Sequence, residues 1–488
     1  MRASGFHGTA RLVAASAPAV LGGSIWLGLE TFRLRSIPGL DLDEAGYFLV
    51  AWRHWEQADP FSGLSRYTGA LPIWFVRLLG SGAPWFSLRA LDVVLNGLAL
   101  VLLAGWLRRR HAIAAIRGWA LPFVATLPHF LVSARHGVET AIFGPVLVFS
   151  GLFLLARGGR GAVFAAGLAW SLAAYNHALW AFVPASLALA WACVYRSVPS
   201  LDWPPFLLGL ATGSAPRLLS LLFYADRTVG GPIEQWQLAP ALDDLGALPD
   251  VLARTLDGRA IYHRFVGGEA VPVLPYFVAA LLFFVPFLPR PRTVPRPLKV
   301  MLLFALILAL VTAVVSPLYD LRYLFAPVLA LGLCVVEAGA LLLERDARYR
   351  LLVWPVAAAI VACNLFYFCA DFLAPWQRGA VTFGDFAFGK RNPHSSNIWY
   401  FPRERLVGTL RELGPEQVLA TPSLERPLRV LMAHDPVKVR LPKSMEPGLR
   451  TVWVDYYSDD PNAERCVNHE SPCFTQPLGV DGLYSIFR

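Results

Sequence analysis

The chain has 488 residues and a formal net charge of +9; 56% of its residues are hydrophobic and only 16% are charged. Soluble domains contain about 45–50% apolar and about 25% charged residues, so this composition indicates a membrane protein. The basic excess does not indicate nucleic-acid binding, because Lys and Arg lie in short clusters between apolar segments and form no single patch.

About eleven apolar segments are long enough, with their flanking residues, to cross a membrane as helices. The first, near residues 10–30, is too long and too weakly bounded for a cleaved signal peptide. The others lie near residues 85–106, 118–134, 140–156, 161–176, 178–195, 204–224, 273–289, 300–316, 323–343 and 351–371. The predicted fold class is an all-α polytopic membrane bundle over residues 1–371, followed by a C-terminal domain over residues 372–488.

The basic clusters lie in alternate loops between the predicted helices. They are Arg108, Arg109, Arg110 and Arg117; Arg157 and Arg160; Arg290, Arg292, Arg296 and Lys299; and Arg345, Arg348 and Arg350. Short cytoplasmic loops are enriched in Lys and Arg, so these loops and the N-terminus are predicted to be cytoplasmic and the C-terminal domain extracytoplasmic. The strong preference for arginine over lysine is typical of a GC-rich bacterium, and we expect a protein of the bacterial inner membrane.

Residues 372–488 are predicted to form a small α/β domain. A helix is expected at 403–413, and strands are expected at 417–420, 428–432, 437–439 and 451–454. Cys466 and Cys473 lie in a polar stretch, where two cysteines outside the cytoplasm most often form a disulfide; a metal pair is less common without further ligands nearby.

Two predicted outer loops are long, residues 31–84 and 225–272, and such loops often carry function. The first contains two segments expected to form interfacial helices, 47–56 and 73–79. It also contains three carboxylates within four residues, Asp41, Asp43 and Glu44. At a membrane surface these charges cost free energy unless they are solvated, paired or bound to a cation.

The acidic cluster has three interpretations. Asp43 could be a helix N-cap, with Glu44 favoured by the helix dipole. It could instead be a general base that takes the proton of an acceptor hydroxyl. Asp41 and Asp43 could also bind a divalent cation such as Mg²⁺ or Mn²⁺, although two carboxylates are weak evidence for a metal site.

The Asp-Glu pair in the first outer loop resembles that of membrane glycosyltransferases with the GT-C fold, such as protein O-mannosyltransferases and bacterial aminoarabinose transferases. The similarity continues through residues 67–74 (YTGALPIW), Leu79 and Gly80, and 85–89 (WFSLR). There the family has a Pro-containing interfacial segment and then an Arg near the start of the next helix. Residues 40–110 match best; the later helices match in layout, and the C-terminal domain matches only in position.

The resemblance implies an activity and a reaction centre. Such enzymes transfer a sugar from a polyprenyl-phosphate or polyprenyl-diphosphate donor to a lipid, glycan or protein on the outer face, usually with inversion. Asp43 would be the catalytic base, with Glu44 beside it. Some relatives use a divalent metal and others do not, so the resemblance requires no cofactor.

A lipid-phosphate leaving group needs nearby positive charge as the glycosidic bond breaks. The candidates are Arg322, His177, Arg217 and Arg135; candidates for the acceptor site or cavity are Asp41, His136, Glu139 and Tyr323. Structural alternatives remain. Arg322 and Tyr323 fit an interfacial belt, whereas Arg135 and Glu139 fit a local ion pair. His177 fits a hydrogen-bonded surface histidine.

Two other classes of protein fit this topology. A transporter or lipid flippase would have charged or helix-breaking groups deep in paired helices and an inverted repeat. Arg217 is the one clear deep charge, and the sequence has no evident repeat. A non-catalytic scaffold of cell-envelope polysaccharide assembly would tolerate the loss of Asp43, whereas an enzyme would not.

Overall fold

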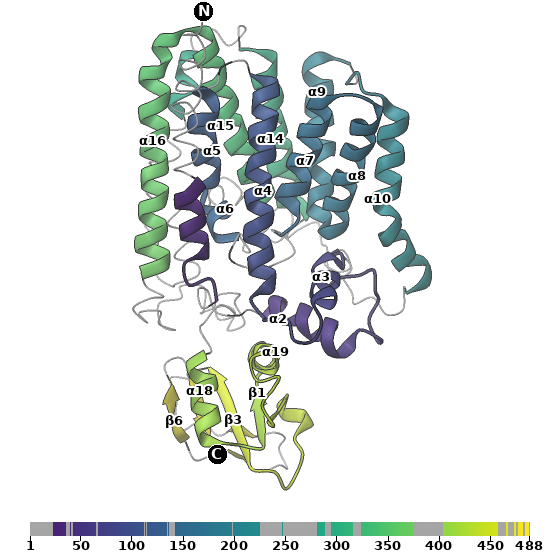
Figure 1. The fold of residues 1–488 in the computed structure, drawn as a ribbon, viewed down its shortest axis with the longest axis vertical. Coiled ribbons are helices and arrows are strands. Elements are labelled where there is room, and N and C mark those ends of the chain that lie inside the picture. The colour runs from purple at the N-terminus through teal and green to yellow at the C-terminus, as the bar shows by residue number, and fades with distance from the viewer. Residues whose placement is uncertain are drawn as a thin grey trace, which may run out of the picture.

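The computed structural model describes residues 23–35, 40, 42–64, 67–111, 113, 115–133, 135, 142–197, 199–224, 246, 281–287, 294–315, 324–374, 404–456, 465–466, 473–474, 477–481 and 484–487. These residues form a helical bundle and, below one end of it, a small α/β domain (Figure 1).

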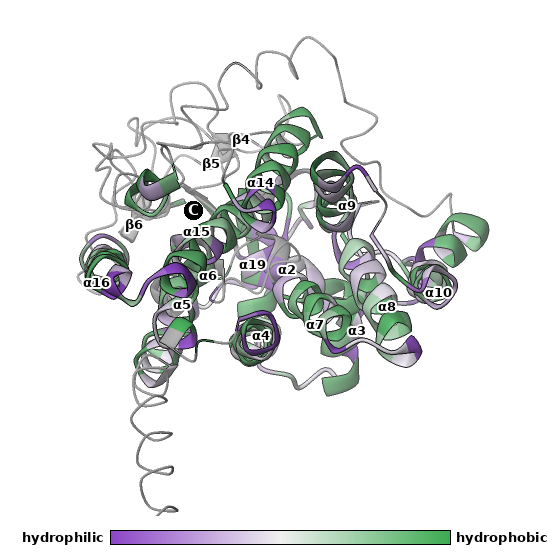
Figure 2. Cartoon of the chain, turned by 90° about the horizontal axis from the view of Figure 1, so that it is seen from above, coloured by the Kyte–Doolittle hydropathy of each residue, from purple (hydrophilic) through white to green (hydrophobic). Residues whose placement is uncertain are grey.

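Apolar helices of different lengths make up the bundle. They are α4 (Ser87–Arg110), α5 (Ala115–Ala125), α6 (Pro128–Ser133), α7 (Gly144–Arg157), α8 (Arg160–Asn176), η2 (Ala178–Ala181), α9 (Phe182–Tyr195), α10 (Trp203–Phe223), α14 (Arg296–Val315), α15 (Phe325–Arg345) and α16 (Arg350–Tyr367). Within the described residues, six helical stretches are long and apolar enough to cross a membrane. In the view along the bundle, much of the bundle's helices is coloured green for hydrophobic residues (Figure 2). The predicted membrane-bundle class is confirmed. The predicted spans near 10–30 and 273–289 lie largely outside the described part of the chain.

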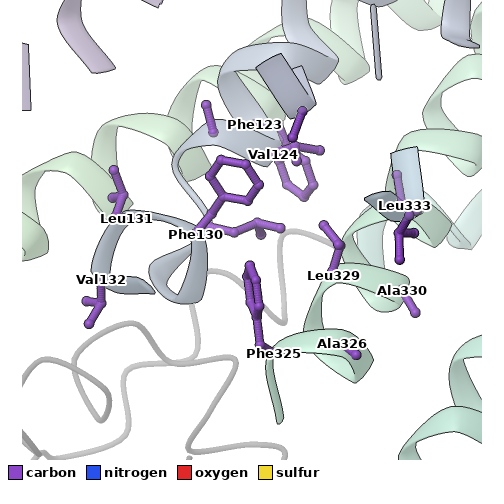
Figure 3. Packing of buried hydrophobic residues seen from close by; sticks show 14 of the residues in the cluster. Phe123, Val124, Phe130, Leu131, Val132, Phe325, Ala326, Leu329, Ala330 and Leu333 are labelled. Carbon is purple, nitrogen blue, oxygen red and sulfur yellow. The ribbon is translucent and has the colours of Figure 1, made fainter. Parts of the chain in front are cut away.

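The span predicted at 118–134 is not one helix. It divides into α5 and α6, which are separated at Thr126 and Leu127. Proline has no N–H and disfavours helical geometry in the preceding residue, so Pro128 starts a new helix. The break packs against the start of α15, where the rings of Phe130 and Phe325 lie 6.2 Å apart (Figure 3).

Close helix packing elsewhere depends on small residues. A Cβ at Gly167 of α8 would lie 2.3 Å from the carbonyl oxygen of Phe206 in α10. A Cβ at Gly209 of α10 would lie 2.1 Å from the carbonyl oxygen of Phe164 in α8. Glycine at both positions therefore lets the two helix backbones approach closely, as small residues do in membrane helix pairs.

The C-terminal domain, which is predicted to be soluble and is named the soluble domain, contains α18 (Glu404–Leu413), α19 (Pro422–Leu431) and a five-stranded sheet in the order β2-β1-β3-β7-β6. Its strands are β1 (Gln417–Ala420), β2 (Lys438–Arg440), β3 (Thr451–Tyr456), β6 (Pro477–Asp481) and β7 (Tyr484–Phe487). Strand β1 pairs in parallel with β2 and β3, whereas β7 pairs antiparallel with β3 and β6. The predicted α/β class of this domain is confirmed.

The strand predicted at 428–432 is wrong, because residues up to Leu431 belong to α19. Leu424 and Leu428 are fully buried and lie four residues apart, on one face of the helix. Residues 428–432 (LRVLM) are too few to show a helical period, and their apolar residues by themselves favour a strand. The helix becomes evident only when the preceding polar turn is included.

Cys466 and Cys473 lie opposite each other in the two-stranded ladder formed by β4 (Arg465–Cys466) and β5 (Cys473–Phe474). Directly opposed residues of an antiparallel pair have their Cα atoms about 4.5–5.5 Å apart, a separation that a disulfide can bridge. The side chains lie outside the described part of the chain, so the disulfide stays a prediction.

A buried polar network joins α4 to α15 at the end of the bundle farthest from the soluble domain. Arg110 donates two hydrogen bonds of 2.9 Å to Glu337. The next residue, His111, lies 3.3 Å from Glu337 and 3.0 Å from Glu344. Burial alone would lower the pKa of His111, but the hydrogen bonds and charges of the two carboxylates raise it above its usual value.

This network predicts a pH-dependent contribution to stability. Because the pKa of His111 is raised in the folded protein, its stabilisation is complete below pH about 6.5 and is lost as the pH rises through the raised value. The detergent-solubilised protein should therefore have a higher melting temperature at pH 6 than at pH 8, and His111→Gln should remove this difference. An equal pH difference in both proteins would contradict the assignment.

Candidate functional site

The acidic segment of the first loop lies where the bundle meets the soluble domain. Helix α2 (Leu42–Leu49) lies at this end of the bundle, and α19 packs against it (Figure 1). Tyr47 and Phe48 of α2 are fully buried, in a cluster that also contains Val430 of α19. Both the bundle and the soluble domain thus hold α2 in place.

Asp43 is the second residue of α2, so it lies in the first turn of this helix rather than at its N-cap. The helix N-terminus favours a negatively charged group there. The side chain of Asp43, and all of Asp41, fall outside the described residues. Helix α2 continues as a π-helical turn, η1 (Val50–His54), and α3 (Leu71–Leu79) follows, close to the two predicted interfacial segments.

Glu44 forms a buried ion pair with Arg89 of α4. Arg89 Nε lies 2.8 Å from Oε1 and Arg89 Nη2 lies 2.7 Å from Oε2, and both side chains are fully buried. Arg89 also donates to the carbonyl oxygen of Leu34 at 3.2 Å and stacks on Trp85 at 4.9 Å. Because both carboxylate oxygens accept hydrogen bonds from Arg89, Glu44 is suited to positioning α2 rather than to accepting a substrate proton.

Arg135 caps the helical segment 23–31. Its guanidinium donates to the carbonyl oxygens of Leu29 at 2.6 Å, Glu30 at 3.1 Å and Phe32 at 2.6 Å. The last carbonyls of a helix have no partner within the helix, so a fully buried arginine satisfies them. These contacts give Arg135, a predicted phosphate ligand, a structural role.

The loop between η1 and α3 is attached to the end of α8 by backbone and side-chain hydrogen bonds. Gly69 N donates to the Asn176 carbonyl oxygen at 2.9 Å, and Tyr175 Oη donates to the Phe61 carbonyl oxygen at 2.7 Å. A Cβ at Gly69 would lie 2.4 Å from the Tyr175 carbonyl oxygen, so only glycine permits this approach. Asp59 accepts a hydrogen bond from Ser220 of α10. These contacts attach the described residues of the loop to α8 and α10.

His177 and Arg217 meet at Thr68 of this loop. His177 is buried, pairs with Thr68 in an isolated β-bridge, and accepts a 3.3 Å hydrogen bond from Leu179 N at Nδ1. Arg217 Nη2 donates to the carbonyl oxygens of Thr68 at 2.9 Å and Tyr175 at 3.2 Å. The structure thus brings together two of the predicted phosphate ligands, which also hold the loop.

The remaining predicted site residues, Arg322, Tyr323, His136 and Glu139, lie outside the described residues. Where the structure describes side chains, no group of three His, Cys, Asp or Glu is placed to hold a metal ion. The sequence does not identify Glu44 and Arg89 as partners. It does place Arg89 at the start of a membrane helix, where an unpaired charge is costly and a partner is expected.

An elongated apolar cavity of about 780 Å³ lies inside the bundle between α4, α7, α8, α9, α10, α14 and α15. Trp180 and Ala326 line it toward the α2 end. Trp180 lies against Gly144, where a Cβ would be 2.1 Å from the indole ring. Two residues earlier, Ile142 belongs to the buried cluster around α2. Trp180, at this end of the cavity, thus contacts the segment that leads to that cluster.

Known proteins resemble this chain in fold but not in sequence. No family model matches it, and no curated protein matches it in sequence. It is similar to the crystal structure of ArnT from Cupriavidus metallidurans bound to undecaprenyl phosphate, with a TM-score of 0.53 and 13% identity over 97% of this chain and 98% of that chain. The apo structure of the same ArnT has a TM-score of 0.49 and 13% identity over 99% and 98% of the chains. The chain therefore has the fold of this ArnT.

The buried ion pair gives a testable stability difference. Arg89→Met leaves the Glu44 carboxylate buried without its partner, which should lower the free energy of unfolding by about 3–5 kcal/mol. The double variant Glu44→Gln/Arg89→Met should lose less than the sum of the two single variants. Denaturant unfolding of the purified protein in detergent measures both effects.

The matched control is Arg160→Gln, which breaks an exposed 3.3 Å pair with Asp202 and should cost less than about 1 kcal/mol. If Arg89→Met were no less stable than this control, the ion pair would not secure α2.

Proposed function

We propose that this protein is a membrane glycosyltransferase that transfers a sugar from a polyprenyl-phosphate or polyprenyl-diphosphate donor to a lipid, glycan or protein acceptor. The observation that supports this most strongly is the GT-C fold, shared along almost the whole chain with an ArnT structure that contains undecaprenyl phosphate. The acidic helix α2 lies at the end of the bundle covered by the soluble domain. The reaction would take place there.

The apolar cavity is the proposed site of the donor's polyprenyl chain. Its volume of about 780 Å³ is within the range of about 300–1,000 Å³ usual for ligand pockets. A chain lying along it would have its phosphate beside Trp180, close to His177 and the Thr68 loop. His177 and Arg217 would then lie near the leaving phosphate, where Arg322 is the further candidate.

Asp43 is the proposed general base. Its carboxylate takes the proton of the acceptor hydroxyl while that oxygen attacks C1 of the sugar and the C1–O bond to phosphate breaks, with inversion. The polyprenyl phosphate leaves with the bonding electron pair, and nearby cations stabilise its negative charge. Glu44, held by Arg89, positions the helix that carries Asp43.

A divalent cation is not part of these steps. Asp41 and Asp43 would supply two hard oxygen ligands, whereas Mg²⁺ prefers six. Among the residues whose side chains are described, no cluster of acidic, His or Cys groups completes such a site. Asp41 and Asp43 are the residues that would hold a divalent cation such as Mg²⁺ or Mn²⁺.

The sidedness of the site is also a proposal. The basic clusters at the ends of α4, α7 and α15 lie away from α2 and the soluble domain (Figure 1). Since basic loops face the cytoplasm, the reaction would take place on the outer face of a bacterial inner membrane. A scaffold of polysaccharide assembly remains the alternative function, and the experiment below distinguishes the two.

The decisive substitution is Asp43→Asn, which removes the base and keeps the size of the side chain. Transfer from a polyprenyl-phosphate sugar should fall by about 10²–10⁴-fold, the usual contribution of a general base. Binding of undecaprenyl phosphate, followed by native mass spectrometry, should not change, because the base does not hold the phosphate.

Asp202→Asn is the control, since the exposed Asp202 carboxylate pairs with Arg160 at the start of α8, away from α2. Wild-type transfer by a folded Asp43→Asn protein would refute the base assignment. Biological activity without detectable transfer by the wild type would favour a scaffold.

A further inference from the structure

The apolar cavity has a second end, away from α2. At this second end it is lined by Arg110 at the end of α4, Tyr195 at the end of α9, Trp203 at the start of α10 and Pro297 at the start of α14. These residues define the far mouth of the cavity. Because each is the terminal part of a long bundle helix, the far mouth lies near the membrane surface opposite the soluble domain.

Two arginines belong to the far mouth. Arg110 lines the cavity itself, and its side chain is 32% exposed. Arg296, beside Pro297, stacks on the ring of the cavity-lining Tyr195 at 5.6 Å. Every other residue lining the cavity is uncharged. The far mouth is thus an apolar space with cationic groups at its edge.

Arg110 has donors left for a ligand. Its pair with Glu337 uses Nε and Nη2, and within the described part of the chain Nη1 makes no hydrogen bond. Glu337 neutralises part of the charge of Arg110. The carboxylates of Glu337 and Glu344 raise the pKa of His111, which favours a second positive charge in the network. Arg296 has no ion pair among the described residues and keeps its full charge for a ligand.

A polyprenyl donor does not explain these arginines. Its phosphate would lie at the α2 end, and the opposite end of a polyprenyl chain is a hydrocarbon that has no need of cations. Basic pockets between membrane helices at a cytoplasmic surface bind anionic lipid headgroups. Aromatic residues with a polar edge, such as Tyr195 and Trp203, are common at the same depth.

We propose that the far mouth is a second lipid site, which takes an anionic phospholipid from the adjacent leaflet. Arg110 and Arg296 bind its phosphate, and its acyl chains enter the cavity between α9, α10 and α14. The site is separate from the proposed transfer and requires no sugar donor.

The test uses the tryptophans that line the cavity, among them Trp191 and Trp203. The full-length protein in detergent micelles is titrated with dibrominated phosphatidylglycerol or dibrominated phosphatidylcholine, and quenching of tryptophan fluorescence is measured. The wild type should bind phosphatidylglycerol more tightly. Arg296→Gln should weaken that binding by about fivefold, and Arg110→Gln/Arg296→Gln by about 25-fold, since each basic group near a membrane surface contributes about a factor of five.

Arg348→Gln is the matched control, because Arg348 is exposed at the same end of the bundle but does not line the cavity. If Arg110→Gln disturbs folding through Glu337, Arg296→Gln alone decides.

Equal binding of the two lipids by the wild type would overturn the proposal. So would an equal loss of phosphatidylglycerol affinity in Arg296→Gln and Arg348→Gln. In a further contrary outcome, undecaprenyl phosphate displaces the brominated phosphatidylglycerol while neither arginine substitution changes its binding. That result would assign the whole cavity to the donor lipid. Sugar transfer is not measured here, so failure of this site leaves the proposed function untouched.

Discussion

The ion pair between Glu44 and Arg89 joins the short helix α2 to the long membrane helix α4. Both side chains are fully buried, and a charge in such a place is strongly destabilising unless it is paired and hydrogen-bonded. The pair therefore admits one position of α2 against the bundle. Since Asp43 precedes Glu44 in the same helical turn, the backbone that carries the proposed base is fixed by a contact that the base itself does not make.

Other contacts at the α2 end of the bundle hold the neighbouring segments in place. Arg217 and His177 hold the Thr68 loop, and α19 covers α2 from the soluble domain. An apolar cavity approaches this assembly from within the bundle and ends at Trp180. This arrangement fits one preorganised site at a membrane surface, fed by a lipid from the side of the helices, better than a conduit for solutes.

The sequence predicted the features that depend on local pattern. Most membrane helices were expected within a few residues of their observed positions, because their length and hydropathy are set by the membrane. Partners distant in the chain were not predicted: Arg89 lies 45 residues from Glu44, and Arg135 reaches a carbonyl 106 residues away. Such pairs depend on how helices pack in three dimensions. The predictions for the break before Pro128 and for helix α19 were wrong for a related reason. A short apolar segment does not reveal where its helix begins.

The central claim is that this bundle holds a polyprenyl-phosphate lipid with its phosphate beside α2 and the Thr68 loop. Photo-crosslinking with an undecaprenyl phosphate analogue that carries a diazirine near the phosphate, followed by peptide mapping, tests it most directly. The account predicts labelled peptides from η2, from the first loop around Thr68 and from the start of α15, with competition by unmodified undecaprenyl phosphate. Labelling confined to the lipid-facing surfaces of the helices, without competition, would contradict it.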